Sequence, residues 1–299
     1  MTTTSLPRRS GPRGGRPRSR ALRRFTRNRP AMAGAVVLAV IVLLAVLAPL
    51  IVAHPPDAVN LEAARQGPSA RYWLGTDTSG RDVFARTVYA GRVSLLVGLL
   101  AAALSVVLGT VLGAVAGLFG RWADTVIMRA ADIVMSFPAV VTIMVLAGIV
   151  GPSVTILVLA IGVTQWPVAA RVVRGVTMSL RDREYLQAAR ISGARALWLI
   201  RTHVVPAALP PVTVTGTLAV AQAIMLETTM SFLGLGVQPP QASWGNMLND
   251  AQNLTLIQTM PWLWIPPGIA IAVTVLAVNF VGDGLRDAVD PRQAAGVRR

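Results

Sequence analysis

The sequence has no cysteine and no lysine, and only two histidines among its 299 residues. Without cysteine, the chain cannot form disulfides or metal sites built on thiolates. The histidines, His54 and His203, lie far apart and lack metal-ligand spacing, so we expect neither a metal site nor a bound cofactor. A Walker-type phosphate loop places a lysine on the nucleotide phosphates, so we expect that this chain does not hydrolyse ATP itself.

Charged residues are also scarce, and most of them have one sign. They make up 14% of the chain, whereas a soluble domain has about 25%. All 28 basic residues are arginine, and the 13 acidic residues leave a net charge of +15. Hydrophobic residues make up 54% of the chain, and the mean hydropathy is +0.58. This composition indicates an integral membrane protein.

Six apolar runs predict transmembrane helices, because a helix needs roughly 20 apolar residues to cross the hydrocarbon of a bilayer. The predicted fold is therefore all-α and embedded in the membrane, with six transmembrane helices. The runs cover residues 31–53, 94–119, 133–150, 154–170, 207–226 and 261–282.

The distribution of arginine predicts the orientation of these helices. If the N-terminus lies in the cytoplasm, all but five arginines fall in cytoplasmic segments. Cytoplasmic loops of membrane proteins are enriched in basic residues, so both termini are expected in the cytoplasm. The five arginines on the outer side would be Arg65, Arg71, Arg81, Arg86 and Arg92.

The predicted organisation has four parts. Residues 1–30 hold ten arginines and no acid, and we expect a disordered basic tail in the cytoplasm. Residues 31–92 comprise the first transmembrane helix and an extracytoplasmic segment. Residues 93–292 form a five-helix core with a cytoplasmic loop at 171–206, and residues 293–299 form a short cytoplasmic tail.

The acidic residues near membrane depth, Asp132 and Glu227, are the only candidates for chemistry within the spans. A proton relay is one interpretation, but a single carboxylate at one end of a span provides no chain of carriers. We favour structural pairing, with Asp132 bound to Arg129 and Glu227 capping interrupted backbone near Gly234 and Gly236. No hydrolase or protease motif occurs, and no catalytic residue is expected.

Gly113 and Gly117 form a G-x-x-x-G motif in the second span. Small residues let membrane helices approach closely, because lipid provides no hydrophobic drive for their association. The motif is compatible with packing inside this chain and with a contact to a second subunit, and both interpretations stay open.

The cytoplasmic loop at 171–206 carries the strongest functional signal. Good helix formers follow Glu184, Ser192 and Gly193 interrupt the helix, and a second helical stretch precedes Pro206. Taken alone, the pattern also fits an amphipathic helix that lies on the membrane surface.

The spacing of Gln187, Ala188, Ala189, Gly193 and Pro206 resembles the E-A-A–x3–G–x9–I–x–L–P loop of binding-protein-dependent importer permeases. In that family the loop forms a coupling helix, which sits in a groove of an ATPase subunit. The resemblance implies that these residues contact such a partner.

The loop departs from the family pattern in two places. Gln187 replaces the glutamate, although Glu184 lies one turn upstream and is available in its place. His203 and Val205 replace the isoleucine and leucine.

Three further stretches, 74–82, 231–248 and 282–291, resemble the C-type permeases of dipeptide and oligopeptide importers, which have close relatives for nickel. The resemblance covers about residues 20–292. It implies a type I importer fold in the plasma membrane and half of a translocation path. The implied partners are a homologous second permease, two ATP-binding cassette subunits that bind the ATP, an extracytoplasmic solute-binding protein and the lipid bilayer, with no nucleic acid.

Three alternatives to a peptide importer stay open. A nickel or other small-solute importer would use nearly the same permease. An ion-coupled secondary transporter needs intramembrane carboxylates, which are almost lacking, and has no use for the long cytoplasmic loop. A non-transporting membrane scaffold leaves the fifth and sixth spans, interrupted by glycine and proline, unexplained.

Overall fold

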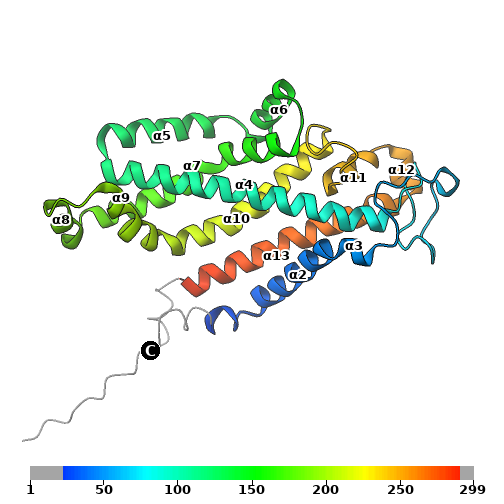
Figure 1. Ribbon diagram of the computed structural model, residues 1–299, viewed down its shortest axis with the longest axis horizontal. Coiled ribbons are helices and arrows are strands. Elements are labelled where there is room, and N and C mark those ends of the chain that lie inside the picture. Colours follow the sequence, from blue (N-terminus) through cyan, green and yellow to red (C-terminus); the bar gives the residue numbers. More distant parts are fainter. Residues whose placement is uncertain (1–22, 290–299) are drawn as a thin grey trace, which may run out of the picture.

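The computed structural model describes residues 23–289, which are helical apart from loops and one isolated bridge between Thr76 and Asp82 (Figure 1). The all-α prediction is confirmed. Residues 1–22 of the predicted basic tail and the whole predicted C-terminal tail lie outside the described residues.

Five of the described helical segments are long and apolar enough to cross a membrane. They overlap all the spans predicted from the sequence except the third. The helices at their centres are α2 (Arg29–Val46), α4 (Val83–Phe119), α7 (Val154–Arg181), α10 (Val205–Phe232) and α13 (Ile265–Val289).

The third predicted span, residues 133–150, is not one helix. It is divided between α5 (Arg121–Ser136) and α6 (Ala139–Val150), whose axes meet at 87°. Pro138 has no N–H to donate and disfavours helical backbone at Phe137, which is extended with φ −102° and ψ 138°. The described chain has a sixth candidate span only if this bent pair is counted as one.

The shorter elements gather at the two ends of the long helices (Figure 1). One end, which we name the α8 end, holds α8 and α9, the end of α4 and the start of α10. The opposite α11 end holds α3, α11 and α12. The shorter elements are α3 (Ala48–Ile51), η1 (Leu61–Ala63), α8 (Glu184–Ile191), α9 (Ala196–Leu199), the π-helix η2 (Ile200–Val204), α11 (Trp244–Asp250), α12 (Leu254–Thr259) and η3 (Pro261–Leu263).

Two long helices extend beyond their predicted bounds. Helix α4 begins at Val83 rather than at Ser94, and the Asp82 carboxylate before it accepts from the Phe84 N–H at 2.9 Å. Its 37 residues span roughly 55 Å, so the helix projects beyond a hydrocarbon layer of about 30 Å. Helix α7 continues to Arg181, so the loop predicted at 171–206 is wrong in extent. The connection between α7 and α10 covers residues 182–204.

Glycines bring α4 and α7 into backbone contact. A Cβ on Gly113 would lie 2.3 Å from the carbonyl oxygen of Ala170, and one on Gly117 would lie 2.5 Å from Cβ of Thr177. Such distances leave no room for a side chain. The face of the G-x-x-x-G motif is therefore filled by a helix of the same chain.

The first span packs on the last one, as Figure 1 shows for α2 and α13. A Cβ on Gly284 would lie 2.2 Å from Cβ of Ala31, and the Asn28 amide donates to the Asp287 carboxylate at 3.2 Å. These contacts join the start of α2 to the end of α13.

We predict that Gly113→Ala destabilises the protein and that Gly175→Ala does not. The new methyl group at Gly113 collides with the backbone of α7, and overpacking of this kind costs about 1–3 kcal/mol. At Gly175, in α7, a Cβ meets no atom within 4 Å. Thermal unfolding of both variants in the same detergent measures the difference. Equal midpoints would contradict the packing described for α4 and α7.

Candidate functional site

Helix α8 is fixed to the end of α4 by one apolar and one polar contact. Leu186 is fully buried and packs with Leu118 of α4 and Leu199 of α9. The Arg190 guanidinium donates to the Leu118 carbonyl oxygen at 3.1 Å. That carbonyl belongs to the last turn of α4, where helical partners are lacking. Helix α8 therefore has a defined position relative to α4.

The predicted coupling residues lie mostly on the outer face of α8. Glu184, Gln187 and Ala188 are exposed, and the exposed Ile191 continues their row one turn further. Positions separated by three, four and seven residues share one face of a helix. We name these four residues the α8 stripe. Ala189 is half-buried and packs on the chain's own Leu186 cluster instead.

A left-handed turn at Gly193 ends α8. Its φ is +82°, and the next N–H, that of Ala194, donates to the Ala189 carbonyl oxygen at 3.0 Å. No atom lies within 4 Å of a Cβ built on Gly193, so only backbone conformation requires glycine here. Pro206 is not part of this turn, because it lies in the first turn of α10.

Large apolar side chains extend the exposed surface beyond the stripe. Leu197 and Trp198 of α9 are 75% and 49% exposed, and Tyr185 of α8 is 52% exposed. Gathered apolar side chains on a surface mark a contact with a protein or a membrane. The sequence prediction missed this part of the site, although adjacent leucine and tryptophan in a loop expected to face water was a usable signal.

The remaining predicted polar residues have structural partners. Asp132 accepts from Arg171 of α7 at 2.8 Å, so the predicted pair with Arg129 is wrong. A second ion pair joins α5 to α7, since the Arg174 guanidinium donates to both carboxylate oxygens of Asp124. Both acids lie on α5 and both arginines on α7, and these pairs hold the amphipathic α5 along α7.

Glu227 is fully buried in α10 and acts on the backbone through a serine. The Ser231 hydroxyl donates to Glu227 Oε1 at 2.8 Å and accepts from the Val237 N–H at 3.1 Å. Gly234, with φ +77°, ends the helix between these two groups. The carboxylate thus supports the turn that the sequence predicted it to cap. It does so indirectly, because Ser231 stands between Glu227 and the backbone N–H of Val237.

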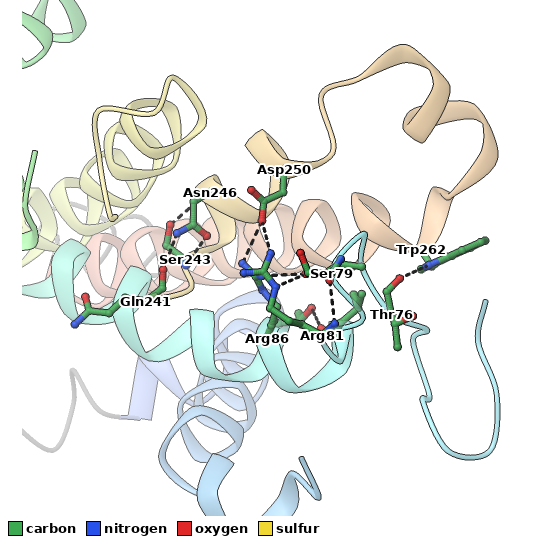
Figure 2. A network of polar contacts seen from close by, with 12 residues as sticks. Thr76, Ser79, Arg81, Arg86, Gln241, Ser243, Asn246, Asp250 and Trp262 are labelled. Carbon is green, nitrogen blue, oxygen red and sulfur yellow. Dashed lines mark hydrogen bonds and ion pairs between the residues drawn. The ribbon is translucent and has the colours of Figure 1, made fainter. Parts of the chain in front are cut away.

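A buried ion-pair network joins the segment before α4 to α11, as Figure 2 shows. Arg86 is 5% exposed and donates to Asp77 at 3.0 Å and to Asp250 at 3.2 Å. Arg81 donates to the same oxygen of Asp77 at 2.6 Å. The sequence prediction used both arginines only as signals of topology. It missed the ion pairs because Asp250 lies far from both arginines in the sequence and Asp77 lies on an irregular turn.

Neutral hydrogen bonds complete the same end of the molecule (Figure 2). The Trp262 indole donates to the Thr76 carbonyl oxygen at 3.2 Å. Asn246 donates to the Gln241 carbonyl oxygen at 2.8 Å and forms a capping box with Ser243 at the start of α11. The α11 end is therefore a compact cap rather than a set of free loops.

The chain is similar to membrane subunits of transport systems over most of its length. The family model for the inner membrane component of binding-protein-dependent transport systems matches residues 109–295. The model for the N-terminal transmembrane domain of oligopeptide transport permease C matches residues 16–68.

Two curated relatives illustrate the similarity. A protein of Brucella suis biovar 1, provisionally named a peptide permease, is 44% identical over 92% of this chain and 91% of its own length. The dipeptide transport system permease protein DppC of Alkalihalophilus pseudofirmus is 39% identical over 91% of this chain and 89% of its own length.

We predict that Arg86→Leu destabilises the protein far more than Arg71→Leu. The first change leaves Asp77 buried beside a single cation, and breaking a buried pair costs roughly 3 kcal/mol. Arg71 is exposed, and among the described residues it makes only a cation–π contact with Tyr72. Thermal unfolding of the two variants in detergent measures the difference. Equal stability of both would show that the network contributes little.

Proposed function

The chain belongs to the family of inner membrane components of binding-protein-dependent transport systems, and we propose that it forms half of the translocation path of an ATP-driven peptide importer. A homologous second permease supplies the other half. Two ATPase subunits bind ATP and contact the α8 end, and a solute-binding protein docks at the α11 end. The chain itself supplies no catalytic residue.

The observation that carries this proposal is the α8 stripe. It lies on a short helix that is anchored to α4 and has an uncovered outer face. The side chain of Ala188 on that face is small, so the wall of a groove in a partner can approach the backbone of α8 closely. Trp198 provides exposed apolar area near α8, because its ring and that of Tyr185 both pack on His203. An ATPase subunit that covers both removes this area from water, which favours association.

The orientation proposed for the chain follows from its arginines. Of the five that fall outside the proposed cytoplasmic segments, Arg81 and Arg86 are paired with Asp77 and Asp250. In the sequence, the other arginines lie in the two terminal segments, in α5 and between residues 171 and 201, which supports placing the termini and the α8 end in the cytoplasm. The family of inner membrane components favours the plasma membrane as the location, with the α11 end outside.

Peptide is the cargo that the relatives favour. The names of both relatives refer to peptides or dipeptides, and each similarity extends over about nine-tenths of the chain. We therefore propose that di- or oligopeptides cross the membrane along this subunit.

We predict that Ala188→Asp abolishes coupling without unfolding the chain. The position is exposed in this subunit, but in the proposed complex the carboxylate would be buried without a partner. Co-purification of the ATPase subunits should weaken by at least about tenfold, and uptake of a toxic peptide analogue should fall with it. Ala189→Asp should act similarly, with an added loss of stability because Ala189 packs on its own chain.

Arg195→Ala is the matched control for Ala188→Asp, because Arg195 is exposed and lies outside the stripe. Arg190 is unsuitable, since it donates to α4. Normal uptake by Ala188→Asp at normal protein levels would reject the coupling role. Normal peptide uptake in a deletion strain, with nickel uptake lost, would reject peptide as the cargo.

We predict that Ser79→Cys reacts with an impermeant thiol reagent added outside intact cells and that Ser192→Cys does not. The natural chain has no cysteine, so each variant carries one reactive site. Ser79 lies in the turn before α4 at the α11 end, and Ser192 ends α8. The reverse result would invert the proposed orientation.

A further inference from the structure

Three amide side chains line one groove in the middle of the long helices. Gln165 of α7, Gln222 of α10 and Asn279 of α13 border a groove of about 470 Å³. A smaller cavity of about 170 Å³ shares Gln165 and Gln222 and extends toward Ser105 of α4. Neither the α8 stripe nor the network at the α11 end includes these residues.

The groove lies near the centre of the spans. Gln165 lies about three turns after α7 begins at Val154, and Gln222 lies about three turns before α10 ends at Phe232. Both of these helix termini lie toward the α11 end (Figure 1), and each amide lies roughly 15 Å from the terminus of its own helix, about half the thickness of the hydrocarbon.

The three amides make no side-chain hydrogen bond to any residue that the structure describes. An amide without a partner is costly in hydrocarbon, so these side chains require a polar contact that the described chain does not supply. By contrast, the Ser105 hydroxyl donates to Ala102 of its own helix at 2.9 Å. The amides thus point to a surface that meets water or a polar ligand.

We propose that this groove binds the backbone of the transported peptide through Gln165 and Gln222. An amide side chain both donates and accepts, and each peptide bond offers one acceptor and most offer one donor. Leu218, Met225 and Val275 supply apolar wall for peptide side chains. Such a surface recognises what all peptides share and is indifferent to their sequence.

The residues that line the groove suit a peptide better than a metal ion. None of the described residues that line the two cavities is charged, and none is histidine. A nickel ion would therefore find no carboxylate or imidazole there, which are the ligands suited to it. The inference rests on the proposed function and adds the residues and the chemistry of binding.

Cysteine labelling tests whether the groove faces the path. In the assembled importer, Gln165→Cys and Gln222→Cys should react with a small charged thiol reagent, and a transported tripeptide should slow both reactions severalfold. Val163→Cys is the matched control, because Val163 is exposed, lies close to Gln165 in the sequence and does not line the groove. It should not react with the charged reagent. Failure of both groove variants to react would show that lipid or the second permease covers these residues, and reaction without protection by the peptide would reject peptide binding.

Transport by the double variant Gln165→Leu/Gln222→Leu tests binding directly. The KM for peptide uptake should rise about tenfold, while co-purification of the ATPase subunits stays normal. Val163→Leu should transport like the natural chain. An unchanged KM in the double variant overturns the inference and leaves the importer intact, whereas absence of peptide uptake by the natural chain rejects the proposed function itself.

Discussion

Backbone contact between α4 and α7 is the constraint on which the rest of the structure depends. Lipid gives helices no hydrophobic reason to associate, so their packing must come from close approach of small residues. Gly109, Gly113 and Gly117 recur one turn apart along α4, and an added Cβ on any of them would collide with α7. This tight pair gives the amphipathic α5 a fixed partner in α7 and gives α8 a fixed base on α4.

Sequence reasoning predicted the helical class and the positions of most spans, because long uncharged runs have few alternatives in a membrane. It misplaced two helix ends. Residues 83–93 and 171–181 are helical, but they are too polar to be predicted as part of a transmembrane helix. It also missed the bend at Pro138. A proline near the start of an apolar run indicates a helix boundary. The angle between the two helices that meet there depends on how they pack against their neighbours.

The candidate site was predictable in part for a similar reason. Spacing along one helix is local, so the face shared by Glu184, Gln187 and Ala188 follows from sequence. By contrast, Ala189 packs against a cluster that includes Leu118, a residue of a different helix that lies far away in the sequence, so its burial could not be predicted locally. The pairs of Asp132 with Arg171 and of Arg86 with Asp250 are likewise between distant elements, and no local pattern specifies them.

The position of α8 connects the proposed coupling surface to the proposed binding groove. On one side, Leu186 and Arg190 join α8 to the last turn of α4. On the other, α9 and the π-helix η2 run without a break into α10, and a π-helical segment is an irregular element often found at functional sites. Helices α4 and α10 both border the smaller cavity, through Ser105 and Gln222. If the proposed partner moves α8, the movement would reach two walls of the groove by separate routes, along α4 and through residues 192–204 to α10, and a difference between the two displacements would alter its width.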